Sequence, residues 1–225
     1  MKTIGIIGAM PSELADIRNM LAGSVVRKYA GYDFYLATYN GKLIVSACCG
    51  IAKVNAALCT QVMIDKFDVD VIINTGIAGG MDTKVKICDI VISESVFPHD
   101  LELRFLENYP PYHSVYEGDK NLIGVVSKVC EEKGIACHIG KIVSGEQFVT
   151  DSNVKKGIVD RFAPLALDME TAAVGQACYR NDIPFVSVRC ISDNADDEGA
   201  MSFDEFEKIA AKRVAEIVME AAVRL

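Results

Sequence analysis

The stretch LALDMETAA, residues 165–173, places two carboxylates where an apolar, strand-like run changes into a helix built from small residues. Asp168 and Glu170 flank Met169, and Thr171 begins the helical pattern. Burial of a carboxylate costs desolvation energy unless the group is paired or used in chemistry. In open α/β sheets, the ends of strands are also where ligands bind. Two interpretations are therefore open. The acids cap the helix and interact favourably with its dipole, or they belong to a functional site.

Apolar strands alternate with amphipathic helices along the whole chain, which predicts an α/β fold. The predicted strands span residues 3–8, 33–39, 43–48, 71–75, 89–96, 138–144, 165–167 and 184–192. Asn40-Gly41 is a strong turn pair that predicts a hairpin between the second and third of them. The capping-box motif SFDE, residues 202–205, predicts the start of the C-terminal helix. No repeat or linker divides the sequence, so we expect one domain over residues 1–225.

The composition narrows the classes of function. The chain has 225 residues, 51% of them hydrophobic, which is enough for a sizeable core. Its formal net charge of −8 argues against nucleic acid or an anionic membrane surface as a partner. No apolar stretch is long enough to span a bilayer, and Pro11 and Glu13 interrupt the first one too early for a secretory signal. Eight cysteines without a CxxC pair favour reduced thiols in a cytoplasmic protein.

Two further acids follow buried strands. Glu13 lies in the first turn after the first strand, and Asp193 ends the run PFVSVRCIS, residues 184–192. Each has a local explanation, because Glu13 can offset the helix dipole and Asp193 can pair with Arg189 on the same side of the strand. Asp168 is a second candidate partner for Arg189. In a mainly parallel sheet, however, such strand ends share one edge. We therefore favour a cluster in which Glu13, Glu170 and Asp193 meet.

A cluster of acids suits cleavage of a glycosidic bond through an oxocarbenium-like state. One acid protonates the leaving group, a second activates water, and a third can hold the hydroxyls of the sugar. Their pKa values must be pushed apart, and Arg189 would help to keep one acid ionised. The sequence has no HExxH, GxSxG or GxxxxGK[ST] motif, so a metal site, a serine hydrolase and a P-loop enzyme are not expected.

Three other segments could contribute to a site. The three glycines of residues 76–80 could form a loop that cradles a ligand through its amides, or a plain tight turn. Phe148 could stack on a flat ligand or belong to the core. The irregular stretch 101–118, rich in tyrosine and proline, could be a lid, an interface or a surface excursion without a role.

Eight motifs, in order over essentially the whole chain, carry a family resemblance: GIIGAMPSE (5–13), CGIAKVNAA (49–57), NTGIAGG (74–80), DIVISE (89–94), SGEQFV (144–149), LDMETAA (167–173), VRCISD (188–193) and SFDEF (202–206). Together they resemble the 5′-methylthioadenosine/S-adenosylhomocysteine nucleosidases. This resemblance implies a nucleoside phosphorylase-like, three-layer α/β/α sandwich with a mixed central sheet, and a homodimer. It also implies irreversible hydrolysis of adenine nucleosides to adenine and the 5′-substituted ribose, with no metal or organic cofactor. The implied substrates are methylthioadenosine, adenosylhomocysteine and, as a further candidate, 5′-deoxyadenosine.

Carried over residue by residue, the resemblance makes Glu13 the base that activates water. Asp193 would protonate the imidazole ring of the purine, and Glu170 would bind the ribose hydroxyls. Phe148 would stack on adenine, and the backbone of Val149 would read its edge. The full set of residues expected to bind substrate is Met10, Ile51, Ala78, Gly79, Phe148, Val149, Met169, Glu170, Arg189 and Ser192.

The sequence departs from the family at two places. Ile77 stands where many relatives carry a small hydroxyl residue, and LELRFLENYPPY, residues 101–112, replaces an Asp-Val-Thr-Ala-Phe-Gly-Tyr-like run. In relatives that run helps to form the pocket for the 5′ substituent, partly across the dimer, so the accepted 5′ tail is left open. Three alternatives also remain: a purine nucleoside phosphorylase, a futalosine-type nucleoside hydrolase, and a non-catalytic nucleoside-binding protein.

Overall fold

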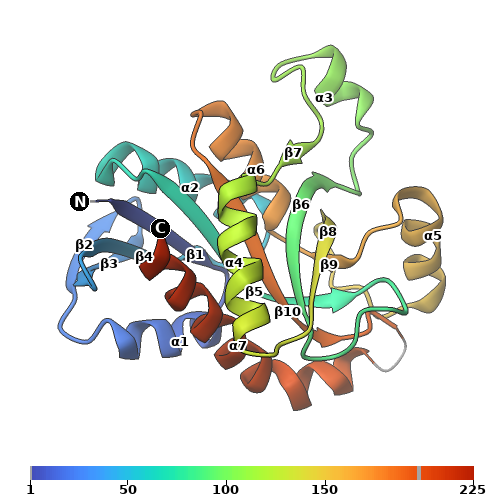
Figure 1. Cartoon of the computed structure of the whole chain (residues 1–225). Helices are drawn as coiled ribbons and strands as arrows, with labels where there is room; N and C mark the ends of the chain where they lie inside the picture. The colour runs from blue at the N-terminus through green and yellow to red at the C-terminus, as the bar shows by residue number, and fades with distance from the viewer. Residues whose placement is uncertain (1, 197–198) are drawn as a thin grey trace.

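The computed structural model describes residues 2–196 and 199–225 (Figure 1). Ten strands within these residues form one mixed sheet. The strands are β1 (Thr3–Gly8), β2 (Val25–Tyr29), β3 (Tyr32–Tyr39), β4 (Lys42–Cys48), β5 (Val71–Gly80), β6 (Ile90–Pro98), β7 (Tyr116–Glu117), β8 (Cys137–Ser144), β9 (Ala166–Asp168) and β10 (Phe185–Asp193). The helices are α1 (Pro11–Met20), α2 (Lys53–Phe67), α3 (Arg104–Asn108), α4 (Lys120–Glu132), α5 (Ser152–Phe162), α6 (Thr171–Arg180) and α7 (Gly199–Arg224).

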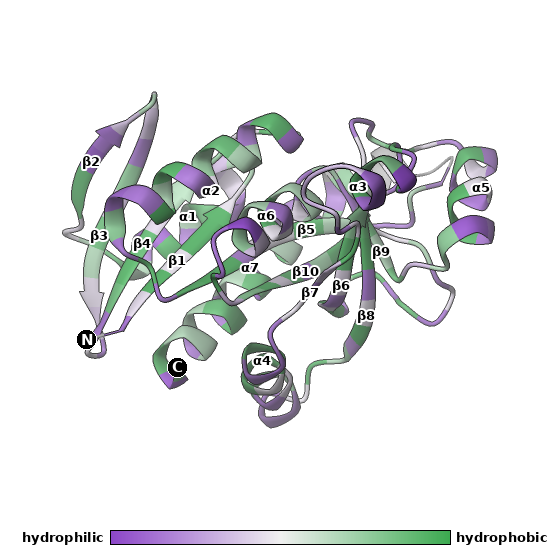
Figure 2. Ribbon diagram, turned by 90° about the horizontal axis from the view of Figure 1, so that it is seen from above, coloured by the Kyte–Doolittle hydropathy of each residue, from purple (hydrophilic) through white to green (hydrophobic). Residues whose placement is uncertain are grey.

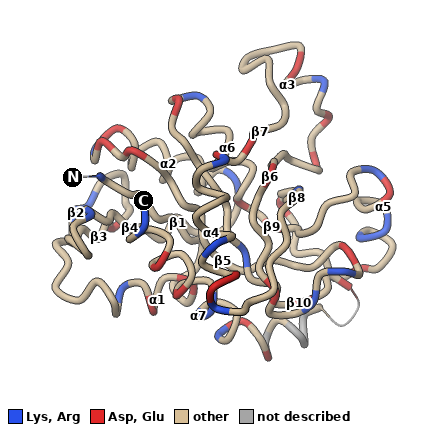
Figure 3. The backbone as a smooth tube through the Cα atoms, viewed as in Figure 1, with Lys and Arg blue, Asp and Glu red and all other residues tan. Residues whose placement is uncertain are grey.

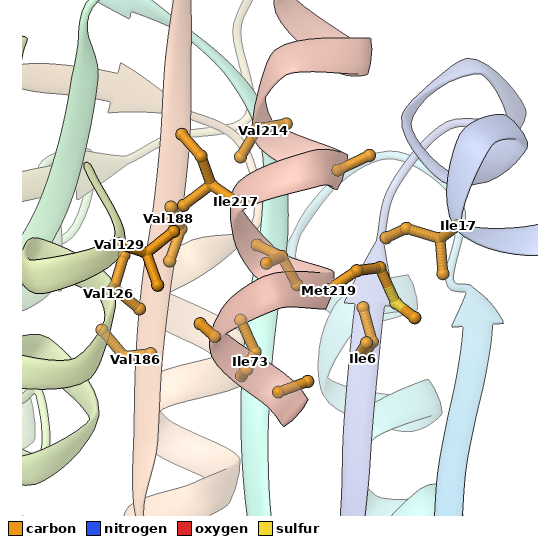
Figure 4. Close-up of a cluster of buried hydrophobic side chains, with 14 of the residues drawn as sticks. Ile6, Ile17, Ile73, Val126, Val129, Val186, Val188, Val214, Ile217 and Met219 are labelled. Atoms are coloured by element: carbon orange, nitrogen blue, oxygen red, sulfur yellow. The ribbon is translucent and has the colours of Figure 1, made fainter. Parts of the chain in front are cut away.

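Helices cover both faces of the sheet, which confirms the predicted three-layer α/β fold. On one face, α1, α4 and α7 enclose a core that includes Ile17, Val126 and Val214 (Figure 4). On the other face, α2 and α6 bury Met63 and Val174 against the strands. The apolar residues recur at helical spacing, so each helix turns one stripe towards the sheet.

Hydropathy and charge follow the same layering. In the view of Figure 2, the strands β1, β5 and β10 are coloured mainly as hydrophobic, whereas α5 alternates hydrophilic and hydrophobic stripes. Charges of both signs are mixed over the outer helices and loops (Figure 3). Among the described residues, no helix is both long enough and apolar enough to cross a bilayer.

Part of the sheet closes on itself. β5 pairs with β10 on one side and with β9 on the other, and β10, β6, β8 and β9 pair in turn, which completes a ring. β1, β5 and β10 run parallel, so their carboxyl ends share one edge. β9 runs antiparallel to β5 and reaches this edge only because the ring closes. Closure therefore brings the LALDMETAA stretch to the ends of the parallel strands.

The strands β2 and β7 were not predicted, and several boundaries differ by one or two residues. Two boundaries differ by more. Residues 76–80 are not a loop, because β5 continues through Gly80 and pairs there with both β10 and β9. The glycine at position 76 is required by close packing, since a Cβ there would lie 2.2 Å from Oε1 of Glu13. The C-terminal helix begins at Gly199, so the capping-box motif of residues 202–205 lies inside α7 rather than at its start.

The predicted hairpin is confirmed. β3 and β4 pair antiparallel, with Tyr39 opposite Lys42. Asn40 and Gly41 between them have φ values of 46° and 79°. Both angles lie in the left-handed region that two-residue hairpin turns of this kind require, and asparagine and glycine adopt it at the least cost.

The irregular stretch 101–118 projects from the body of the molecule (Figure 1). Its short helix α3 buries none of its residues, and Phe105, Tyr109 and Tyr112 are exposed. At the base of the projection, His113 stacks on Tyr179 of α6 with ring centroids 4.5 Å apart. The projection is therefore anchored at its base and carries an apolar, uncovered tip.

Candidate active site

A cavity of about 340 Å³ opens at the edge where β1, β5, β9 and β10 end. Its volume falls within the range of small-molecule sites. All of the residues predicted to act on or bind the substrate line it, with the exception of Arg189. The lining residues that the sequence did not assign to substrate are Ala9, Ile77, Gln147, Leu167, Asp168, Ala195 and Phe203.

Glu13 occupies the third position of α1 and is only 2% exposed. Its Oε2 accepts hydrogen bonds from the backbone N–H groups of Ala9 (2.7 Å) and Met10 (2.9 Å). Its Oε1 accepts a third from Ile77 (3.0 Å), so the departure at position 77 leaves the backbone donor in place. Burial raises the pKa of Glu13, while Arg189 and these three donors oppose the rise. Glu13 therefore caps α1 and also faces the cavity.

Arg189 lies behind the cavity and is fully buried. Its Nη2 is 2.6 Å from Oδ2 of Asp168, and its Nη1 is 3.8 Å from Oε1 of Glu13. The sequence suggested a pair with Asp193, but the register of β10 shifts between Ile191 and Asp193. That irregularity breaks the alternation of side chains on which the expectation rested. Arg189 therefore joins Asp168 and Glu13 instead.

A buried polar network fixes the guanidinium of Arg189. Nη2 donates to Oδ1 of Asn74 (2.6 Å) and to Oγ1 of Thr171 (2.8 Å). Nε donates to Oγ of Ser187 at 3.2 Å. Asn74 in turn donates from Nδ2 to the carbonyl of Ile7 at 3.0 Å, in the strand that leads to Glu13. Nη1 is buried without a hydrogen-bond partner and faces Glu13. The bonds to Nη2 and Nε hold the buried charge in one geometry.

Asp168 behaves as the capping interpretation predicted. Its carboxylate accepts hydrogen bonds from the backbone N–H groups of Glu170 (3.3 Å) and Thr171 (3.2 Å) at the start of α6. It also accepts hydrogen bonds from the hydroxyls of Thr171 and Ser144, the latter at 2.5 Å. With the ion pair to Arg189, these contacts occupy both of its oxygens.

Glu170 is the N-cap residue of α6, but its side chain makes no cap hydrogen bond. Its Oε1 accepts instead from the backbone N–H of Ala52 at 2.8 Å, across the cavity edge from the start of α2. Burial, and then the neighbouring carboxylate of Asp168, raise the pKa of Glu170 to about 7. Glu170 is thus a cavity-facing acid, and the two carboxylates of LALDMETAA have separate environments.

Asp193 is 1% exposed and ends β10. Its Oδ1 accepts from the backbone N–H of Ala195 (2.7 Å) and its Oδ2 from the hydroxyl of Ser192 (2.8 Å). Burial is the largest influence on this carboxyl and raises its pKa, so a proton stays on it at higher pH than on an ordinary aspartate. A raised pKa suits a group that must donate a proton.

An aromatic wall closes one side of the cavity. Phe148 is half-exposed and meets Phe203 edge to face, with centroids 5.4 Å apart. Phe203 lies in the motif SFDEF, the signal from which it could have been predicted. Among the described residues, no cluster of three or more His, Cys, Asp or Glu could hold a metal ion.

This fold is shared with a known class of proteins. The family described as "Phosphorylase superfamily" matches residues 3–223. The 5′-methylthioadenosine/S-adenosylhomocysteine nucleosidase of an Exiguobacterium species is 40% identical over 99% of this chain and 98% of its own length. The chain belongs to the 5′-methylthioadenosine/S-adenosylhomocysteine nucleosidase family of that superfamily.

Solved structures agree with this placement. A nucleosidase of this name from Neisseria meningitidis, in complex with methylthio-immucillin-A, superposes with a TM-score of 0.95 at 35% identity and full coverage of both chains. A futalosine hydrolase of Helicobacter pylori superposes with a TM-score of 0.94 at 31% identity, covering 100% of this chain and 98% of its own. The fold is therefore shared by enzymes whose names give different nucleoside substrates.

Proposed function

We propose that this protein hydrolyses the N-glycosidic bond of 5′-methylthioadenosine and S-adenosylhomocysteine, releasing adenine and the 5′-substituted ribose. The observation that carries the proposal is the meeting of Glu13, Glu170 and Asp193 in one cavity beside Phe148. The names of relatives at 35–40% identity over the full chain support the choice of substrate. 5′-Deoxyadenosine, which shares the base and the sugar, is a further candidate substrate.

In the proposed reaction, Asp193 gives its proton to the imidazole ring of the purine, and adenine leaves as a neutral base. The positive charge that develops on the sugar is stabilised by the nearby carboxylates. Glu13, whose anionic form is favoured by Arg189 and three N–H groups against the effect of burial, removes a proton from the attacking water. Glu170 accepts hydrogen bonds from the ribose hydroxyls, and Met169 packs against the sugar. Arg189 does not touch the substrate in this scheme; it positions the acids.

The lining of the cavity favours water over phosphate as the second substrate. Phosphate recognition needs cationic donors. Of the described residues that line the cavity, none is lysine or arginine, and Glu13 would repel an anion. We therefore expect methylthioadenosine to yield adenine and free sugar in phosphate-free buffer. Strict dependence on phosphate, with a sugar phosphate as product, would show a phosphorylase instead. No turnover at all, with tight nucleoside binding, would show a binding protein.

A futalosine-type hydrolase is the second candidate, favoured by the likeness to the Helicobacter pylori enzyme and by the unusual stretch 101–112. A substrate panel resolved by chromatography separates the two. We expect adenine release from methylthioadenosine and adenosylhomocysteine at a higher kcat/KM than base release from futalosine. The reverse order would assign the second function.

We also propose that the chain forms a homodimer through α2 and α6. Val54 and Leu58 project from α2 with 70% and 54% of their surfaces exposed, and a hollow of about 440 Å³ lies between the two helices. An apolar face of this kind is typical of an interface. Light scattering on the wild type and on Leu58→Glu should show a dimer and a monomer. A monomeric wild type would contradict the proposal.

Three further assignments belong to this proposal: a single domain over residues 1–225, a cytoplasmic location, and activity without a cofactor. The eight cysteines are all free thiols, which suits a reducing compartment. Full activity after dialysis against a chelator is the expected result for the last of these assignments.

A further inference from the structure

The acid Asp193 is the last residue of β10, at the point where the chain leaves the sheet. Regular pairing of β10 with β5 is interrupted just before it, where the register shifts between Ile191 and Asp193. The turn that follows contains Ala195 at a φ of 51°, which is unusual for a residue with a side chain. This turn donates the Ala195 N–H to the carboxylate of Asp193, and strand pairing does not hold it, so a contact from outside the strand must restrain it.

Lys155, on α5, supplies that restraint. Its Nζ donates to the carbonyl oxygen of Asn194 at 2.5 Å and to that of Gly80 at 2.9 Å. Asn194 directly follows Asp193, and Gly80 directly follows Gly79, the β5 residue that pairs with Asp193. One ammonium group therefore ties the Asp193 turn to the end of β5.

The packing of α5 fixes the place of this ammonium. Ile158 lies three residues after Lys155, on the same face of the helix. It is buried in a small core that also contains Val149 and Ala195. Asp151 caps the start of α5 through the N–H groups of Asn153 and Val154. Lys155 is thus half-buried on a capped, anchored helix rather than a free surface side chain.

We propose that Lys155 is a positioning residue for hydrolysis, whose ammonium locks the Asp193 turn against β5 so that the acid faces the purine. Lys155 does not line the cavity and touches no substrate, since it lies on the outer side of the turn in a separate hollow with Asn194 and Met81. The proposal rests on the role given above to Asp193.

The same ammonium acts on the charge of Asp193. The groups that face this carboxyl are the Ser192 hydroxyl, the Ala195 N–H, the Asp196 carboxylate and the Lys155 ammonium. Lys155 opposes the effect of burial and of Asp196, so its removal raises the pKa of Asp193 further. Because the reaction needs the protonated acid, the alkaline limb of the kcat profile should then move to higher pH.

The test compares Lys155→Met with Lys155→Arg, which keeps the charge, and with Lys156→Met. Lys156 is the matched control, because it is the next residue on α5 and pairs with Asp160 in the solvent. For Lys155→Met we expect kcat for methylthioadenosine to fall about tenfold with KM changed less than about twofold, since only the orientation of the acid is lost. The alkaline limb should shift upward. Lys155→Arg should restore most of kcat, and Lys156→Met should match the wild type.

Wild-type kcat and an unmoved pH profile in Lys155→Met would overturn the proposal. So would failure of Lys155→Arg to restore kcat in a folded variant. If Lys155→Met does not fold, Lys155→Gln repeats the test with a polar side chain, and failure of both to fold would make the residue structural and overturn the proposal. Absence of adenine release by the wild type would instead reject the proposed function, and this inference with it.

Discussion

Glu13 and Asp193 line the same cavity, but different groups hold them. Glu13 is fixed by three backbone N–H groups, and the buried cation Arg189 lies 3.8 Å away. Asp193 is fixed by one N–H and one hydroxyl, and Lys155 holds the turn that follows it. No arginine of the described residues pairs with Asp193. Burial raises the pKa of both carboxyls, but only at Glu13 does a neighbouring arginine oppose the rise. This difference in surroundings supports the proposed roles of Glu13 as base and Asp193 as acid.

The difference also concerns stability. Arg189 and Asp168 form a buried ion pair within a network of hydrogen bonds, so the Glu13 side belongs to the core of the molecule. The Asp193 side depends on a turn and on one lysine from α5. A substitution on the Glu13 side should therefore lower the free energy of unfolding as well as the activity. A substitution on the Asp193 side should lower the activity alone.

The largest expected effect is that of Asp193→Asn. Asparagine keeps the shape and can accept the Ala195 N–H, but it carries no acidic proton. We expect kcat to fall about 10⁴-fold, the upper end for loss of a general acid. The Kd for methylthioadenosine should change by less than about threefold, because the lost proton transfer belongs to the transition state. Single-turnover kinetics measures the rate of bond cleavage, and titration calorimetry measures the Kd. Asp160→Asn, on the exposed face of α5, is the control.

Arg189→Met tests the other side. Loss of the guanidinium leaves Asp168 and Glu13 buried without their cation, so we expect the unfolding free energy to drop by about 3 kcal/mol in urea titration at pH 7.5. Adding Asp168→Asn should recover part of this loss, because one unpaired charge is removed. Arg104→Met, which breaks an exposed pair with Glu102, should cost less than about 1 kcal/mol. Equal losses in the buried and exposed variants would contradict the comparison.

Glu170→Gln should change the pH dependence of stability. The native pKa of Glu170, about 7, lies above its ordinary value of 4.5, so the native state holds the proton more tightly than the unfolded chain. The contribution of Glu170 to the free energy of unfolding is therefore lost as the pH rises from 4.5 to 7. Glutamine does not titrate, so the variant does not lose stability through this residue as the pH rises. Relative to the wild type, the variant should gain about 3 kcal/mol between pH 4.5 and pH 8. A difference that does not vary with pH would refute the raised pKa.

The smallest effect is expected from Phe148→Ala, in the wall rather than at either acid. Half of the ring is exposed, so its loss should leave the thermal midpoint nearly unchanged. Stacking on a flat base contributes about 1 to 3 kcal/mol in related settings, and a tenfold rise in KM for methylthioadenosine corresponds to about 1.4 kcal/mol. We expect a rise of about that size with a smaller change in kcat. An unchanged KM would remove Phe148 from the base-binding wall.

Much of the site could be predicted from local sequence. Glu13, Glu170 and Asp193 each follow a strand, and strand ends can be recognised from apolar runs and the residues that stop them. Capping and catalysis were posed as alternatives, but they coexist. Glu13 caps α1 while it faces the cavity, whereas at the start of α6 Asp168 caps and Glu170 faces the cavity.

The sequence offered both Asp193 and Asp168 as partners of Arg189 but could not decide between them, because the outcome depends on an irregularity of one residue in the pairing of β10. Strand alternation placed Arg189 and Asp193 on the same side, and the register shift removed that relation. Lys155 gave no signal at all. It is one of several lysines on polar helices, and only the docking of α5 brings its ammonium to the two carbonyls.

The sequence by itself determined the α/β class, the acids at the strand ends and the family, because these depend on residue type, order and short-range periodicity. Only the tertiary structure decided which charges meet. The antiparallel β9 reaches the parallel edge through closure of the ring, and β5 runs on through its glycines to pair there. Both outcomes depend on strand pairing between residues far apart in the chain, and local periodicity carries no information about that pairing.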